Sequence, residues 1–136
     1  MLPTNTPYPL VLLALVMLRE ARGEGLDGMR AVAHVIANRV HAKWGDWEQV
    51  ILGKNQFSSM TVLGDSQTIW YPTEDQIEPI LEIAEKVMNG TDLDDPTHGA
   101  VYYANLANVT SGWFKTHIAD VKPVTAVVGH HTFFGA

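Results

Sequence analysis

Two glutamates near the amino terminus are the residues best placed for acid–base chemistry. Glu20 and Glu24 fall in LREARGEG (residues 18–25), directly after the apolar run LVLLALVML (residues 10–18). A helix formed by that run carries an acid at its carboxyl end, where burial and the helix dipole both favour the protonated form. Such an acid can donate a proton near neutral pH. Glu20 is therefore the candidate catalytic acid, and Glu24 the candidate secondary acid.

A purely structural interpretation of these two residues stays open. Glu20 would then form a salt bridge with a nearby arginine, either Arg19, Arg22 or Arg39. Glu24 lies among glycines beyond the helix, so we expect it to be more exposed than Glu20 and to act as a structural or secondary carboxylate.

Polar and aromatic side chains in later segments are typical of a carbohydrate-binding groove. Gln56 and Ser58, in QFS (residues 56–58), offer hydrogen bonds to sugar hydroxyls. Tyr102 and Tyr103, in DPTHGAVYYAN (95–105), point to opposite faces if this segment is a strand, so one belongs to the core and the other to a cleft. Further aromatic platforms, or ordinary core residues, are Trp70–Tyr71 and Trp113–Phe114.

The composition argues against several other kinds of site. The chain has no cysteine, which excludes disulfides and thiolate catalysis. The histidines form no HExxH motif, and the adjacent His130 and His131 should diverge on a strand, so we expect no metal and no cofactor. The formal net charge is −6 and there is no cluster of basic residues, so nucleic acid is not an expected partner.

The elements that must position these residues predict one α+β domain over residues 1–136, mainly helical, with helices first and a small sheet late. Asp27, Asp46 and Thr73 are the expected caps of the second, third and fourth helices. Segment 55–72 should be irregular. The expected helices are 8–21, 28–44, 47–52 and 74–88, and the expected strands lie in 100–105 and 123–134.

The apolar run at residues 10–18 is predicted to be a core helix rather than a targeting or membrane segment. No basic side chain precedes it, and no cleavage pattern follows it before Arg19. It is also much shorter than the roughly 20 residues that span a bilayer. We therefore expect no signal peptide and no membrane insertion, with the protein made in the cytoplasm.

Four motifs in a fixed order carry a resemblance to a known family. They are EARGEGLDGMRAVAHVIANRV, then QFS, then DPTHGAVYYAN, then Trp113 with the terminal VGHHTFF. Together they resemble the catalytic domain of the SleB/CwlJ-type cell wall hydrolases, which include spore-cortex-lytic enzymes, over about residues 12–134. The resemblance implies a lysozyme-like, mainly helical fold with a small antiparallel β element near the carboxyl terminus.

The resemblance also implies a substrate and its binding residues. The substrate is peptidoglycan, cut in the glycan strand between N-acetylmuramic acid and N-acetylglucosamine, and the essential glutamate of the family falls on Glu20. We expect a monomer that needs no cofactor. The residues expected along the substrate groove are Gln56, Ser58, Tyr103, Asn105 and Trp113.

The reaction type stays open at this point. A lytic transglycosylase needs only Glu20, whereas a lysozyme-type muramidase needs a second carboxylate, for which Glu24 and Asp95 are candidates. Two other classes are a zinc-dependent N-acetylmuramoyl-L-alanine amidase and a non-catalytic peptidoglycan-binding module. Because neither an export signal nor a separate wall-binding domain is seen, we expect a phage endolysin that reaches the host cell wall through a holin. A virion-borne lysin, or a piece of a longer protein, stays open.

Overall fold

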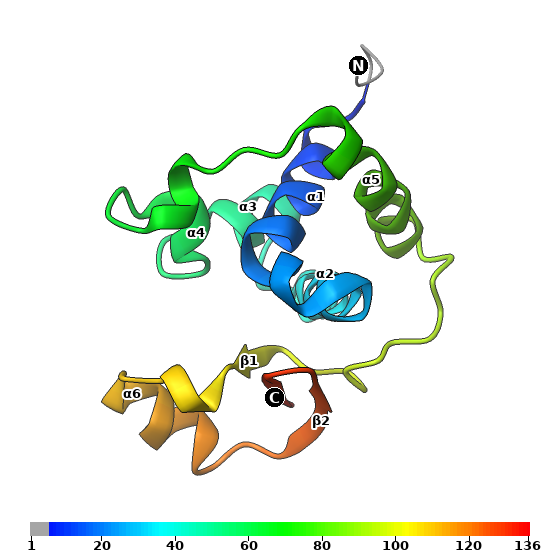
Figure 1. The fold of residues 1–136 in the computed structure, drawn as a ribbon. Coiled ribbons are helices and arrows are strands. Elements are labelled where there is room, and N and C mark those ends of the chain that lie inside the picture. Colours follow the sequence, from blue (N-terminus) through cyan, green and yellow to red (C-terminus); the bar gives the residue numbers. More distant parts are fainter. Residues whose placement is uncertain (1–5) are drawn as a thin grey trace.

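The computed structural model describes residues 6–136, so residues 1–5 of the predicted domain lie outside the described part. Helices α1 to α5 form one part, and a small sheet with α6 forms a second part beside it (Figure 1). The helices are α1 Tyr8–Ala21, α2 Gly25–His41, α3 Trp47–Leu52, α4 Ser58–Thr61, α5 Glu74–Met88 and α6 Gly112–Phe114. The strands are β1 Tyr102–Ala104, β2 Val124–Val128 and β3 His131–Phe134.

The first helix is buried nearly all round, as its apolar sequence predicts. Leu13, Val16 and Met17 are fully buried, and α1 contacts α2, α3, α4 and α5. Pro9 lies in the first turn, where its missing N–H costs little. A helix held on several sides fixes the position of its last turn, which carries Glu20.

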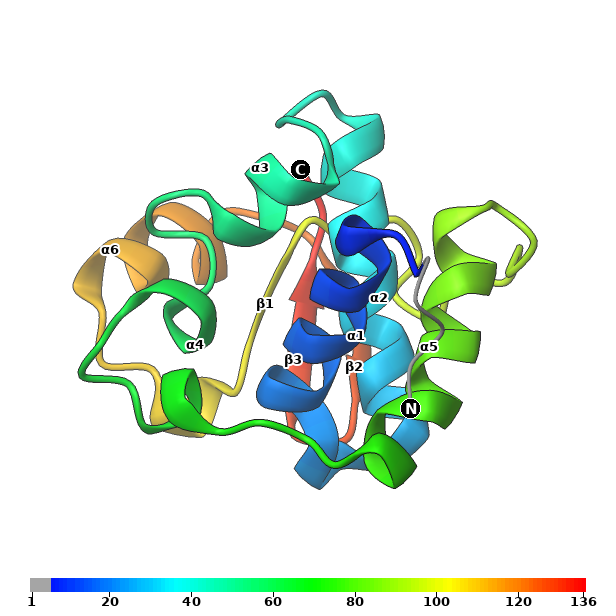
Figure 2. The same ribbon diagram turned by 90° about the horizontal axis from the view of Figure 1, so that it is seen from above.

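Helix α2 joins the two parts of the molecule. One face, with Val32 and Ile36, packs into the helical core around α1. Another face, with Ala31 and Val35, packs on Phe133 of the sheet. Because both faces are apolar, the sheet is held against the helices rather than hanging from a linker (Figure 2).

The start of α2 differs from its prediction. Asp27 is not the cap but lies inside the first turn, and Glu24 takes the capping position. A 3₁₀ turn, Arg22–Glu24, follows α1 directly, and Gly25 then redirects the chain with a φ of 77°. The helix also stops at His41, before the predicted Trp44, because Lys43 turns the chain with a φ of 66°.

The other two predicted caps are confirmed. The Asp46 carboxylate accepts the Gln49 N–H at 2.8 Å, and the Gln49 side chain accepts the Asp46 N–H at 2.9 Å. Thr73 and Gln76 form the same reciprocal pair at the start of α5. Pro79 lies inside α5, yet the helix continues to Met88. The segment expected to be irregular, 55–72, contains only the short α4 and a 3₁₀ turn, Ser66–Ile69.

The sheet is antiparallel with strand order β1–β3–β2. Tyr103 pairs with Phe133, and β2 and β3 form a hairpin whose turn contains Gly129 with a φ of 57°. The strands lie in the two predicted segments but are shorter than predicted. The expected class, mainly helical with a small antiparallel sheet near the carboxyl terminus, is confirmed.

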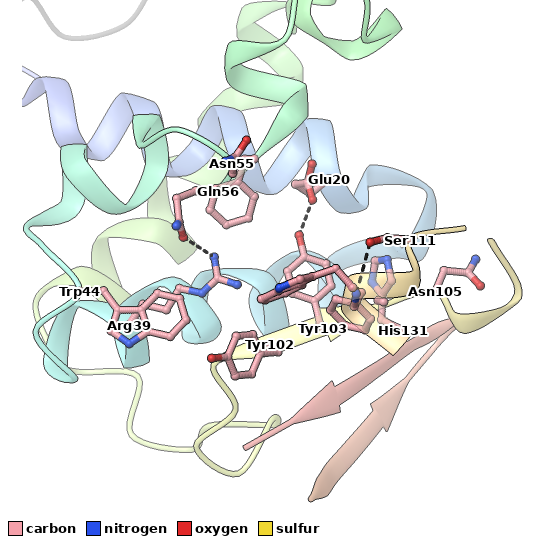
Figure 3. Close-up of a pocket in the computed structure, with 14 residues that line it drawn as sticks. Glu20, Arg39, Trp44, Asn55, Gln56, Tyr102, Tyr103, Asn105, Ser111 and His131 are labelled. Atoms are coloured by element: carbon pink, nitrogen blue, oxygen red, sulfur yellow. Dashed lines mark hydrogen bonds between the residues drawn. The ribbon is translucent and has the colours of Figure 1, made fainter. Parts of the chain in front are cut away.

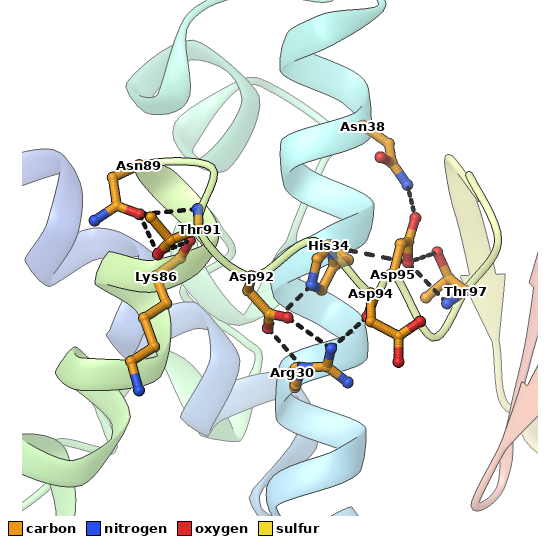
Figure 4. Close-up of polar contacts among 10 residues, drawn as sticks. All are labelled: Arg30, His34, Asn38, Lys86, Asn89, Thr91, Asp92, Asp94, Asp95 and Thr97. Atoms are coloured by element: carbon orange, nitrogen blue, oxygen red, sulfur yellow. Dashed lines mark hydrogen bonds and ion pairs between the residues drawn. The ribbon is translucent and has the colours of Figure 1, made fainter.

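A polar network ties the linker between α5 and β1 to the side of α2 (Figure 4). Arg30 donates two hydrogen bonds to the Asp92 carboxylate, at 2.6 and 2.7 Å. His34 contacts the same carboxylate at 3.3 Å, and Asn38 donates to Asp95 at 2.9 Å. These contacts fix the linker, and therefore the start of β1, against α2.

Candidate active site

A groove of about 890 Å³ runs between the helical part and the sheet. Its walls come from the end of α1, from α2, from residues 55–57, from β1 and β3, and from the segment that contains α6. Its size falls in the range of small-molecule sites. The predicted site residues that line it are Glu20, Gln56, Tyr103, Asn105 and Trp113.

Glu20 occupies the last turn of α1 and is half-buried rather than fully buried. Its carboxylate accepts a hydrogen bond from the Tyr103 hydroxyl (Figure 3). Within the described residues, no ion pair joins it to Arg19, Arg22 or Arg39, so the salt-bridge interpretation does not describe this site. Glu20 is also the sole carboxylate among the residues that line this groove in the described part of the chain.

The neighbouring arginines are used elsewhere. Arg19 is buried and donates to backbone carbonyls at 2.9 to 3.1 Å, those of Ser59, Thr68 and Trp70. The Arg22 guanidinium lies 3.7 Å from the centre of the Trp70 ring. These contacts hold segment 55–72 against α1. The predicted platform Trp70–Tyr71 therefore covers arginines and does not line the groove.

Tyr103 is held by other rings while its hydroxyl reaches Glu20. Its ring lies 5.0 Å from that of His131 and 5.6 Å from that of Phe133. Burial, followed by the charge of Glu20, raises the pKa of Tyr103 well above its ordinary value, so the phenol stays protonated and donates. Tyr102 lines the groove as well, against Trp44 at 5.5 Å. The expected division into one core and one cleft tyrosine is therefore wrong.

Glu24 does not line the groove, although it is close to Glu20 in the sequence. Its carboxylate accepts the backbone N–H of His130 at 3.1 Å and contacts the His130 ring nitrogen Nδ1 at 3.0 Å. The backbone hydrogen bond is the main reason that the pKa of Glu24 is lowered, against the effect of burial. Glu24 thus anchors the β2–β3 turn. With 16% of its side chain accessible, Glu24 is half-buried, as Glu20 is.

Two glycines make room for this anchor. A Cβ added at Gly28 would lie 2.3 Å from the Glu24 Cβ, and one at Gly129 would lie 2.1 Å from a Glu24 carboxylate oxygen. Any larger residue at either position would push the carboxylate away from the turn. Gly28 of the first motif and Gly129 of the terminal motif are therefore explained by Glu24 rather than by the groove.

Asp95, the other candidate for a second carboxylate, also lies outside the groove. Burial raises its pKa, but hydrogen bonds from Asn38, Thr97 and Gly99 outweigh burial and lower it. Its carboxylate is therefore ionised and fully engaged in holding the linker before β1. Neither candidate second acid lines the groove.

Of the remaining predicted binding residues, Asn105 and Trp113 line the groove and Ser58 does not. Ser58 donates to Asp65 at 2.7 Å and does not line the groove. Asn105 lines it while its side chain accepts the Ala107 N–H at 3.2 Å. Trp113 is 61% exposed at the groove edge and stacks on His117 with an interplanar angle of 15°. An exposed aromatic ring of this kind is suited to stacking on a sugar.

Several residues of the groove were not predicted from the sequence as binding residues, among them Arg39, Trp44, His131, Asn55 and Ser111. His131 is 9% exposed, and its Nδ1 is buried without a hydrogen-bond partner in the described structure. Burial lowers the pKa of His131, which leaves the imidazole neutral. Arg39 stands within a quoted motif, but the sequence suggested only a salt bridge for it. Trp44 follows the end of α2, and no sequence pattern around it indicates a binding role.

Two further properties concern the described residues only. Among residues 6–136, no group of three or more His, Asp or Glu is arranged to hold a metal ion. In the same part of the chain, no helix combines the length and apolar character needed to cross a bilayer.

Comparison with known proteins finds relatives of one kind. Spore cortex-lytic enzymes of Oceanobacillus iheyensis and Bacillus subtilis are 33% and 32% identical over 90% of this chain, which spans only 40% and 36% of their lengths. The catalytic domain of the germination-specific lytic transglycosylase SleB from Bacillus anthracis superposes with a TM-score of 0.70 at 29% identity, covering 98% of this chain and 99% of that one. The catalytic domain of the Bacillus cereus SleB protein gives a TM-score of 0.69 at 29% identity, with 97% of each chain covered.

The family assignment follows from a family model. The model described as Cell Wall Hydrolase matches residues 23–134, which is most of the chain. This match begins after Glu20, whereas the superposed SleB domain covers 98% of the chain. The chain belongs to the Cell Wall Hydrolase family.

Proposed function

We propose that this chain cleaves the glycan strand of peptidoglycan between N-acetylmuramic acid and N-acetylglucosamine as a lytic transglycosylase, with Glu20 as general acid and base. The observation that carries this proposal is that Glu20 is the sole carboxylate lining the groove in the described structure. Hydrolytic glycosidases usually place two carboxylates across the scissile bond. Here Glu24 and Asp95 are engaged elsewhere, which favours a route that needs one.

The proposed reaction uses one carboxyl group twice. Glu20 first gives its proton to the glycosidic oxygen as the bond from that oxygen to C1 of the muramic acid breaks. The Glu20 carboxylate then takes the proton of the C6 hydroxyl on the same sugar, and the C6 oxygen bonds to C1. The products are a new N-acetylglucosamine hydroxyl end and a 1,6-anhydromuramic end. The Tyr103 hydroxyl stabilises the carboxylate between the two steps.

The two other classes receive less support. An amidase of the expected kind requires a zinc-binding set, and the described residues offer none. A binding module has no need of a half-buried carboxylate held by a tyrosine. Mass spectrometry of soluble products from purified peptidoglycan separates all the classes: we expect anhydro ends. Reducing ends would indicate a muramidase, released stem peptides an amidase, and no products a binding module.

A pair of glutamine variants tests the acid itself. Glu20→Gln keeps the shape but cannot donate a proton, so its turnover should fall by about 10²–10⁴-fold or more. Its melting temperature should be unchanged or raised. Glu24→Gln should keep most of its turnover, because a glutamine oxygen can still accept the His130 N–H. Active Glu20→Gln together with inactive Glu24→Gln would reverse the assignment, and activity in both variants would reject a glutamate acid.

The biological use as a phage endolysin, and the monomeric state, stay predictions of the sequence. In a Gram-negative host, co-expression with a pore-forming holin should cause lysis, whereas expression of the Glu20→Gln variant with the same holin should not. Intact cells with the active enzyme would argue against the lysin role without affecting the chemistry.

A further inference from the structure

Arg39 is a buried cation in the groove with no carboxylate partner in the described structure. It is 7% exposed. Its Nε donates to the Val101 carbonyl at 2.8 Å, and its Nη1 donates to the Gln56 side chain at 3.3 Å. No hydrogen bond from Nη2 to any residue between 6 and 136 is found. Figure 3 shows the guanidinium in the middle of the groove, between Gln56, Trp44 and Tyr103.

Leaving a charge buried and unpaired is strongly unfavourable. Two aromatic faces compensate in part, since the guanidinium carbon lies 4.9 Å from the Trp44 ring centre and 5.2 Å from that of Phe57. Glu20 forms no hydrogen bond or ion pair with Arg39 in the described structure, because its carboxylate accepts from Tyr103, so it attracts the guanidinium only at longer range. Burial accordingly lowers the pKa of Arg39, although the group stays charged.

Direct stabilisation of the reaction does not account for this cation. The sugar gains positive charge as the glycosidic bond breaks, and a nearby guanidinium repels it. An anion supplied by the substrate would satisfy Arg39 while leaving the reacting carbon to Glu20. The guanidinium fork is the side-chain group that best matches a carboxylate.

We propose that Arg39 forms an anion subsite that binds a carboxylate carried by the substrate strand. In peptidoglycan that carboxylate is either the lactyl group of a muramic acid that has lost its peptide or a group on the stem peptide. The exposed ring of Trp44 covers the apolar part of the same substituent. This inference rests on the proposed function, since it names the part of that glycan substrate that the groove selects.

Binding in the Glu20→Gln background tests the subsite without cleavage. Two pairs of soluble glycan fragments are titrated by calorimetry. The first pair is peptide-free strands with the lactyl carboxylate either free or converted to its methyl amide. The second pair is peptide-bearing strands with the stem carboxylates either free or amidated. Neutralising the recognised carboxylate should weaken binding about 10- to 100-fold, as expected for hydrogen bonds to charged groups. The pair that shows the loss identifies the source.

Arginine variants supply the second half of the test. When Arg39→Gln is added, charged and neutral ligands should bind with nearly the same dissociation constant, so that their ratio is about one. Arg22→Gln is the matched control, because Arg22 also lies over a tryptophan ring but does not line the groove. This variant should keep the full ratio of dissociation constants between neutral and charged ligands. If Arg39→Gln does not fold, Arg39→Lys replaces it. Lysine keeps the positive charge but lacks the forked guanidinium, so the preference for charged over neutral ligands should become smaller without being lost.

Equal binding of charged and neutral strands by the Glu20→Gln protein would overturn the subsite. An unchanged preference for charged strands in the Arg39→Gln variant would overturn it as well. Both results leave the proposed function untouched, because that function is tested separately, by the anhydro products of the parent enzyme and by the activity of Glu20→Gln.

Discussion

The proposed acid, Glu20, has a hydrogen-bond partner that is far from it along the chain. Tyr103 donates its hydroxyl to the Glu20 carboxylate, and its ring packs between His131 and Phe133. A rigid donor of this kind holds the carboxylate in one orientation and stabilises its charge. Tyr103 lines the groove, and if Glu20 is the acid, we expect Tyr103 to act as its positioning residue.

Tyr103→Phe tests this positioning role. The ring stays in place while the hydrogen bond is lost, so kcat should fall about tenfold or more with KM little changed. Tyr102→Phe is the matched control and should retain activity, since Tyr102 contacts Trp44 through its ring. Steady-state kinetics on solubilised glycan strands checks both variants. Unchanged kcat in Tyr103→Phe would reject the role. Tyr103→Ala is a poorer test, because the loss of the ring also disturbs packing around Phe133.

At the scale of elements, contacts remote from the groove fix its walls. Arg19 holds segment 55–72, Glu24 anchors the β2–β3 turn, and Arg30 with Asp92 binds the linker before β1 to α2. Each contact joins an element of the helical part to a segment with little regular structure of its own. The groove therefore depends on polar anchors at places where short elements cannot hold themselves.

The anchor at Asp92 predicts a pH-dependent stability. Hydrogen bonds from Arg30 are the main reason that the pKa of Asp92 is lowered from its ordinary 3.8 to about 2. Because the folded-state pKa is depressed, the stabilisation is complete above the unfolded-state pKa and is lost as the pH falls from about 4 toward 2. Urea unfolding between pH 2 and 5 should show a smaller pH dependence in Asp92→Asn than in the parent. Asp94→Asn is the control that should behave like the parent. Equal slopes in the parent and Asp92→Asn would show that the ion pair contributes nothing measurable.

At the scale of the whole molecule, the two parts share one helix and should not unfold separately. Val32 and Ile36 of α2 belong to the helical core, while Ala31 and Val35 of the same helix pack on the sheet. Tyr103 also packs against both clusters. Removing the sheet would expose one face of α2, so the parts are coupled energetically.

Scanning calorimetry should therefore show one transition, with equal calorimetric and van't Hoff enthalpies. The Glu24→Ala variant should lower the melting temperature and still unfold in a single step, because it frees only the β2–β3 turn. Two resolved transitions in the parent would mean that the sheet unfolds independently of the helices.

The sequence by itself determined what depends on local pattern. The apolar run predicts the buried helix α1 with Glu20 in its last turn, and Asp46 and Thr73 form the expected caps. These predictions succeed because helix periodicity and capping are set by residues within a few positions of one another. The mainly helical class with a late, small sheet follows from the same signals.

Only the tertiary structure decided which polar residues face one another. Glu20 and Glu24 are near neighbours in the sequence, yet the 3₁₀ turn Arg22–Glu24 lets Glu20 contact Tyr103 at the groove while Glu24 contacts His130 at the hairpin. Arg39 is a second example, since α2 places its guanidinium against the Gln56 side chain, and no ion pair joins it to a carboxylate among residues 6–136. Such contacts join segments that packing around α2 brings together. Their distances depend on the whole fold, so they cannot be predicted from residue spacing along the chain.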